Sequence, residues 1–331
     1  MSIEIFKEHL SGNKFDSLYL FYGPEEFLKK KYLDNMVDLS IEKGTEALNK
    51  IVFKGEIDTG KLIEACRTMP FFSERKMVIV KNSGFFKNKS GNYEDLISFF
   101  SVIPSHTILV FVEDEIDARL KITKAIKEKG LMVELEYQKA DELAKWVMKG
   151  FKTFNKEIDY KTASLLVEYC EPGMTGIYNE IEKITAYMGE EKKVQARHIE
   201  DVVTKSIKAI IFDLLDAIFE KKSEKAMVLF RDMLNLREPV PRILVMVAWQ
   251  LRMVLELKAC QQKGIPLPKA AARLKIAPFV LKKLTRQIEN YDIDTLKKAM
   301  EDCHKLDLGI KTGQIDPQTG MEMLILKYAA S

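Results

Sequence analysis

The segment from Phe21 to Lys30 occupies the position of a phosphate-binding loop, between a strand-like run and a helical pattern. A working loop reads Gly-x-x-x-x-Gly-Lys-Ser/Thr, because its glycines let backbone N–H groups converge on phosphates and its hydroxyl binds Mg²⁺. Gly23 and Lys29 stand at the first-glycine and lysine positions. Leu28, however, replaces the second glycine and Lys30 replaces the hydroxyl. The segment therefore predicts a degenerate loop that binds no nucleotide and needs no cofactor.

Other residues that could carry catalysis have the wrong spacing. Glu113, Asp114 and Glu115 follow an apolar run, as magnesium-binding acids do, but without a phosphate cradle we interpret them as a solvated loop. The four histidines form no His-x-x-x-His or Glu-x-x-His pair, and the four cysteines form no Cys-x-x-Cys pair. We therefore expect no metal site, no disulfide framework and no catalytic activity of the chain's own.

The elements that would position these residues fall into three regions. Over residues 15–137 short apolar runs alternate with helical patterns, which predicts a parallel sheet covered by helices on both faces. The expected strands are 18–22, 51–53, 77–80, 107–112 and 132–135, and the expected helices are 25–39, 59–68, 94–100 and 117–129. The fold class is thus α/β plus all-α.

From residue 139 onward helical spacing replaces the strand signals. We expect a domain at 1–138, a small helical domain at 139–207 and a helical domain at 208–331. The helices of the second domain are expected at 143–154, 163–169, 177–188 and 197–203. Those of the third are expected at 210–219, 224–234, 241–258, 269–275, 278–287, 293–311 and 319–327.

Size and composition exclude several classes of protein. A chain of 331 residues exceeds the about 250–300 residues at which single cores stop growing, so several domains are expected. With 47% hydrophobic and 31% charged residues the chain is predicted to be globular rather than disordered. The start of the chain resembles no signal peptide, and the longest apolar run, Ile243–Trp249, is too short to span a bilayer. We expect a cytoplasmic protein with reduced thiols.

A basic segment runs from Arg252 to Arg286, with nine basic residues and one acidic residue. Two short helical patterns within it could pass as a helix-turn-helix, but Ile276, Phe279 and Leu284 suit packing better than base reading. Non-specific contact with DNA phosphates needs only charge. Tyr291 either stacks on an unpaired base or packs within the protein. The candidate DNA contacts are Lys269, Arg273, Lys275, Lys282, Lys283, Arg286 and Tyr291.

Two adjacent phenylalanines, Phe71 and Phe72, lie between an expected helix and an expected strand. Pro70 ends the helix, because the residue before a proline is pushed out of the α region. The connection is therefore short and carries apolar rings at its tip. Two interpretations stay open at this point: a lid packed on its own domain, or a plug that enters a groove on another protein.

Three stretches of the chain resemble the delta subunit family of the bacterial DNA polymerase III clamp loader. They are LYLFYGPEE (18–26), MPFFSERKMVIV (69–80) and NEIEKI (179–184), and the likeness covers nearly the whole chain. The resemblance implies an AAA+-like N-terminal domain that has lost ATPase activity, a helical lid domain and a C-terminal helical collar. The collar would hold the chain in a ring with delta-prime and tau/gamma subunits, which hydrolyse ATP.

The resemblance also implies a role for the phenylalanine pair. In the family, a hydrophobic pair at this position enters a pocket on the sliding clamp (the beta subunit) and opens the ring during DNA replication. Many members have Leu-Phe there. Phe71 differs from that leucine in size, so the role is kept, but how the larger ring fits the pocket stays an open question. Met69 and Pro70 would shape the tip, and Arg75 would orient it or contact the rim. The remaining alternatives are a divergent AAA+ ATPase and a helix-turn-helix DNA-binding protein.

Overall fold

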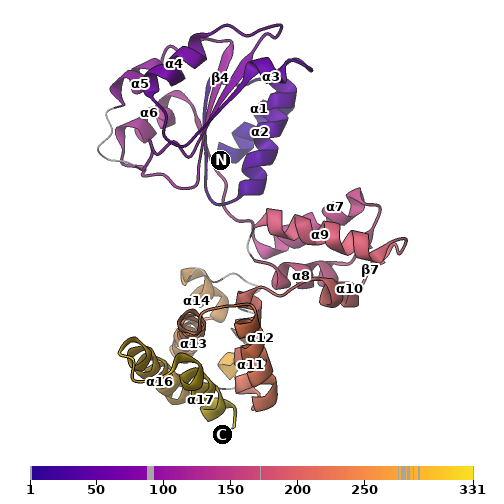
Figure 1. Cartoon of the computed structure of the whole chain (residues 1–331), viewed down its shortest axis with the longest axis vertical. Coiled ribbons are helices and arrows are strands. Elements are labelled where there is room, and N and C mark those ends of the chain that lie inside the picture. Colours follow the sequence, from indigo (N-terminus) through magenta and orange to yellow (C-terminus); the bar gives the residue numbers. More distant parts are fainter. Residues whose placement is uncertain are drawn as a thin grey trace. The chain divides into compact units, whose positions relative to one another are not determined.

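The computed structural model describes residues 2–87, 93–171, 173–274, 276, 281, 284–285, 287–289 and 291–330. They form two compact units (Figure 1). The first unit comprises residues 1–138 with the short segment 172–175, and the second comprises 139–171 with 176–331. The expected fold class, α/β plus all-α, is confirmed. The borders of the three expected domains stay a prediction.

The first unit is built on a five-stranded parallel sheet of order β2-β3-β4-β1-β5. The central strands are buried on both faces, which explains why they read as continuous apolar runs. All five expected strands are present, and no end of a strand differs from the expected position by more than one residue. They are β1 (Leu18–Tyr22), β2 (Lys50–Lys54), β3 (Lys76–Lys81), β4 (Thr107–Glu113) and β5 (Leu131–Glu134).

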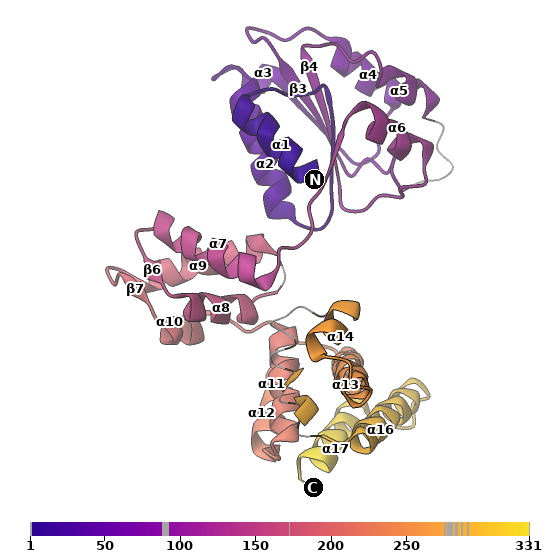
Figure 2. The same cartoon turned by 180° about the vertical axis from the view of Figure 1, so that it is seen from behind.

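Helices cover both faces of this sheet (Figure 2). On one face α1 (Ser2–Gly12) and α2 (Glu26–Ser40) share a core with the odd-numbered residues of β1, including Tyr19. On the other face α4 (Thr59–Arg67), α5 (Glu94–Phe99) and α6 (Lys121–Lys129) share a core with Leu18 and Leu20. The short helix α3 (Glu46–Asn49) precedes β2. The helix that was expected to begin at residue 117 begins four residues later, at Lys121, and ends at Lys129 as expected.

The second unit begins with α7 (Ala140–Thr153) and α8 (Tyr160–Tyr169), followed by α9 (Met174–Met188) and α10 (Ala196–Val202). The sequence predicted no strand in this region, and that expectation is wrong. Two-residue strands β6 (Glu157–Ile158) and β7 (Lys193–Val194) pair in parallel. Strands this short show no alternation of apolar and polar residues, so no pattern could reveal them.

The rest of the second unit is helical around one core. Its central helix α13 packs against α11, α14, α16 and α17, in keeping with its apolar composition all round. The helix expected at 278–287 lies largely outside the described residues. Among the described helices, none is long and apolar enough to cross a membrane. The helices of this part are α11 (Ile207–Phe219), α12 (Ser223–Asn235), α13 (Val240–Gln262), α14 (Leu267–Arg273), α16 (Ile293–Lys311) and α17 (Pro317–Ala329).

Candidate binding tip and the degenerate phosphate loop

The connection between α4 and β3 carries an exposed apolar tip. Phe71 is 55% exposed, Phe72 is 79% exposed and Met69 is 71% exposed, while Pro70 is half-buried. The two rings contact each other edge to face, with centroids 4.4 Å apart. Of the two interpretations of this pair, a lid packed on its own domain is therefore wrong for this structure. The exposed rings have the geometry that a plug needs.

The base of this tip is fixed by hydrogen bonds to the last carbonyls of α4, which no helical N–H group can satisfy. The Lys76 ammonium, buried at the start of β3, donates to the Ala65 carbonyl. The Thr107 hydroxyl, at the start of β4, donates to the Cys66 carbonyl at 2.7 Å. Side chains from two central strands thus hold the end of α4, and the tip projects from a rigid support.

Two further side chains, those of Asn49 and Ser73, hold the tip itself. The buried Asn49 side chain donates to the Phe71 carbonyl and accepts from the Phe71 N–H, both at 2.7 Å. The Ser73 hydroxyl accepts from the Glu42 N–H at 3.2 Å and donates to the Arg75 carbonyl at 2.9 Å. The sequence pattern did not single out Asn49 or Ser73, because their partners lie elsewhere in the fold or are backbone atoms.

Arg75 was expected either to orient the tip or to contact a partner at its rim. Its guanidinium donates to the Phe15 carbonyl at 3.5 Å, and the residue is half-buried. This contact within the domain favours the orienting role.

At the degenerate phosphate loop, the turn after β1 packs tightly against the chain that follows β5. Gly23 has φ of +116°, and a Cβ atom there would lie 2.5 Å from the Leu135 carbonyl oxygen. The buried Glu25 carboxylate accepts hydrogen bonds from the Phe27 N–H at 3.2 Å and from the Met174 N–H at 3.1 Å. Burial raises the pKa of Glu25. A carboxylate of the chain itself therefore caps the start of α2, where a phosphate would bind in a working loop.

The loop lysine is also paired within the protein. The Lys29 ammonium is buried and forms ion pairs with Glu26 and, at 2.9 Å, with Asp114. Burial opposes the charged form, but hydrogen bonds to the two carboxylates outweigh it and raise the pKa of Lys29. The hydrogen bond from Lys29 lowers the pKa of Asp114. The charge that would attract a phosphate is thus already neutralised, while Lys30 is exposed and Leu28 is half-buried.

Of the three acids that we expected in a solvated loop, Asp114 and Glu115 are exposed, but Glu113 is the last residue of β4 and does not fit that expectation. Glu113 is buried, and its carboxylate accepts from the Ser83 N–H at 2.8 Å and from the Ser83 hydroxyl at 2.6 Å. Burial raises the pKa of Glu113. Asp114 pairs with Lys29, and Glu115 is exposed. Two of these three acids therefore stabilise the end of the sheet.

In the basic segment, Lys269 and Arg273 are exposed at α14 and available to an anionic partner. Tyr291 is only 9% exposed, and its ring lies 3.9 Å from that of Phe219. The base-stacking interpretation of Tyr291 is corrected in favour of packing, because its ring is covered. Leu284 is buried, as a packing residue should be. The other candidate DNA contacts, Lys275, Lys282, Lys283 and Arg286, lie outside the described residues.

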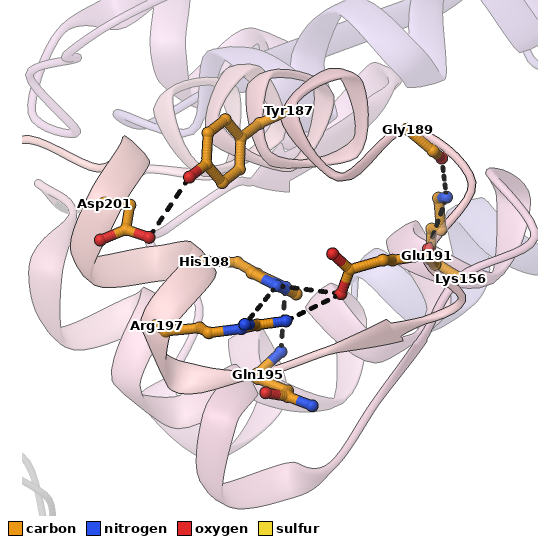
Figure 3. A network of polar contacts seen from close by, with 8 residues as sticks. All are labelled: Lys156, Tyr187, Gly189, Glu191, Gln195, Arg197, His198 and Asp201. Atoms are coloured by element: carbon orange, nitrogen blue, oxygen red, sulfur yellow. Dashed lines mark hydrogen bonds and ion pairs between the residues drawn. The ribbon is translucent and has the colours of Figure 1, made fainter.

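A second polar network lies beside β6, β7 and α10 (Figure 3). Lys156 donates to the Glu191 carbonyl at 2.7 Å, and the Glu191 carboxylate pairs with Arg197 at 3.0 Å. The buried His198 ring accepts from the Gln195 N–H at 3.3 Å, which caps α10. These contacts join the strand pair to the helix and have a structural role. Within the described part of the chain, no three His, Cys, Asp or Glu residues are placed to hold a metal ion.

Comparison with known proteins gives consistent matches along the chain. Residues 19–136 match the family model described as DNA polymerase III, delta subunit, and residues 208–328 match the model of the C-terminal domain of the same delta subunit. DNA polymerase III subunit delta of Bacillus subtilis is 26% identical, over 99% of this chain and 96% of its own length. The solved structure of the B. subtilis DNA clamp loader delta protein matches with a TM-score of 0.62, covering all of both chains.

Proposed function

We propose that this chain, which belongs to the DNA polymerase III delta subunit family, binds and opens a ring-shaped sliding clamp through Phe71 and Phe72. The observation that carries the proposal is the exposure of both rings on a tip whose base is fixed by buried hydrogen bonds. Met69, Phe71 and Phe72 are exposed together at one tip, and exposed apolar groups that cluster in this way, unlike scattered single residues, commonly mark an interaction site. Met69 and Pro70 complete the apolar surface of the tip.

Opening follows from differential affinity rather than from chemistry. A ligand shifts an equilibrium only by the difference between its affinities for the two states. A plug that binds the clamp more tightly when the interface between the clamp's subunits is open therefore stabilises the open ring. Buried aromatic anchors are frequent hot spots of binding energy, which suits Phe71 and Phe72 to this task.

In this proposal the chain does not hydrolyse ATP. The internal pairing of Lys29 with Glu26 and Asp114, and the cap supplied by Glu25, support this part, because nucleotide phosphates would have to displace these acids. ATP bound by the tau/gamma subunits would instead control when the tip reaches the clamp. A nucleotide-binding assay on the isolated chain tests this, and specific binding of ATP would overturn it.

The proposal extends to the rest of the chain, and membership of the family supports it. Residues 208–331 form the collar that joins delta-prime and tau/gamma, residues 139–207 form the lid domain, and the complex works in the cytoplasm as part of the DNA polymerase III holoenzyme. Lys269 and Arg273 contact primer–template DNA without sequence preference, since phosphate neutralisation needs charge alone.

The experiment that tests the proposal mixes the purified chain with the sliding clamp of the same cell and measures binding. The same measurement is made on the chain with Phe71→Ala and Phe72→Ala. The proposal expects tight binding by the first chain and a large loss in the second. Equal binding by both chains would overturn it.

A further inference from the structure

Asn49, the last residue of α3, is 1% exposed and is directed at the binding tip. Its amide makes both hydrogen bonds that a neighbouring strand would make with Phe71, one to the N–H and one to the carbonyl, each at 2.7 Å. The Asn49 amide group also donates to the Thr45 hydroxyl at 3.0 Å, while that hydroxyl donates to the Glu42 carbonyl. This second contact fixes which end of the amide is the donor.

The backbone at the tip needs such support. Phe72 has φ of +51°, in the left-handed region that bulky side chains rarely adopt. Conformations of this kind persist only where the surrounding structure determines them. The two rings are largely exposed, so packing of the rings on the domain cannot supply that determination. The hydrogen bonds from Asn49 to the preceding residue are buried contacts that can.

We propose that Asn49 is a positioning residue, which holds Phe71 and Phe72 in the clamp-binding conformation before the clamp arrives. The inference rests on the proposed function and names a residue that never needs to touch the clamp. A preordered tip avoids the cost of ordering side chains and backbone on binding. If the tip of an Asn49 variant spends about a tenth of its time in the competent conformation, the apparent Kd rises about tenfold.

The test compares Asn49→Ala and Asn49→Asp with the unmodified full-length chain in binding to the sliding clamp. Asn49→Asp keeps the acceptor for the Phe71 N–H but removes the donor to the carbonyl. We expect both variants to bind about tenfold more weakly, mainly through slower association, because fewer tips are ready to bind. Hydrogen exchange at the Phe71 N–H should be faster in Asn49→Ala, which has lost its acceptor.

Two controls separate positioning from general damage to the fold. Ile79→Val removes one methyl group from the sheet core and lowers stability without touching the tip. Asn179→Ala removes an exposed asparagine from α9. Both controls should bind the clamp as the unmodified chain does. If Ile79→Val also slowed association, lower stability would explain the Asn49 effect and the proposal would fail.

The outcomes distinguish this inference from the function on which it rests. Loss of binding in the Phe71→Ala, Phe72→Ala chain with unchanged binding in both Asn49 variants would overturn the role of Asn49 and leave the plug intact. Unchanged binding in the phenylalanine variant would overturn both. Faster dissociation with unchanged association in Asn49→Ala would also reject preordering, since it would indicate that Asn49 stabilises the bound complex instead.

Discussion

Replacing both tip phenylalanines with alanine should weaken clamp binding by an amount that the exposed areas set. Burying one phenylalanine side chain contributes about 1.5–3 kcal/mol. Phe71 is 55% exposed and Phe72 is 79% exposed, so a partner could bury the equivalent of about 1.3 phenylalanine side chains. This burial would contribute about 2–4 kcal/mol to the binding free energy. The Kd of the double variant should therefore rise about 30- to 700-fold.

Surface plasmon resonance with immobilised clamp measures this change, and the single variants refine it. Phe72→Ala should cost more than Phe71→Ala, because Phe72 has more surface still to bury. Thermal unfolding should be nearly unchanged in both, since neither ring supports the core. Trp249→Ala, which removes an aromatic residue that is 49% exposed in the second unit, is the matched control and should bind normally. A double variant that binds within about twofold of the unmodified chain, less than 0.5 kcal/mol, would refute the reasoning.

Three further predictions follow from the other contacts. Lys29→Met should leave ATP-driven clamp loading by the assembled loader unchanged but lower the thermal midpoint of the chain, because the lysine pairs with the protein's own acids. A loss of loading with an unchanged thermal midpoint would instead indicate that Lys29 binds nucleotide. Lys269→Ala with Arg273→Ala should weaken binding to duplex DNA of any sequence and reduce its salt slope by about 1.8; a loss confined to one sequence would contradict this. Burial raises the pKa of Glu113 in the folded chain, so its stabilising contribution is present at low pH and is lost as the pH rises through that raised pKa. Urea titrations of the unmodified chain and of Glu113→Gln measure this effect. As the pH rises above 4.5, the unfolding free energy of the unmodified chain should fall relative to that of Glu113→Gln. A difference between the two chains that does not change with pH would refute the prediction.

Most of the first unit could be predicted because its central strands, β1, β3 and β4, are buried on both faces. Runs such as Leu18–Tyr22 and residues 108–112 are apolar throughout, and that pattern needs no knowledge of the partner strands. The helix at Ser2–Gly12 was missed because charged and apolar residues alternate at its start, which hides the helical spacing of Ile3, Phe6 and Leu10 on the face that packs on the sheet. The strand pair of β6 and β7 was missed because two residues form no period.

The candidate site could be predicted only in outline. The sequence around Phe71 and Phe72 indicated a short apolar connection. Whether their rings are exposed depends on which other parts of the domain pack against that connection, and the local sequence does not contain this information. The hydrogen bond from Lys29 to Asp114 joins residues that are 85 positions apart, and that from Asn49 to Phe71 spans 22 positions. Such contacts form only when the folded sheet brings distant loops together, so no local sequence motif indicates them.

The central claim is that the exposed tip opens the clamp ring without ATP. The most direct measurement loads the clamp onto nicked circular DNA and follows its release when the isolated chain is added, with no nucleotide present. We predict that the unmodified chain releases the clamp and that the Phe71→Ala, Phe72→Ala chain leaves it on the DNA. Release at the same rate by both chains would contradict the claim.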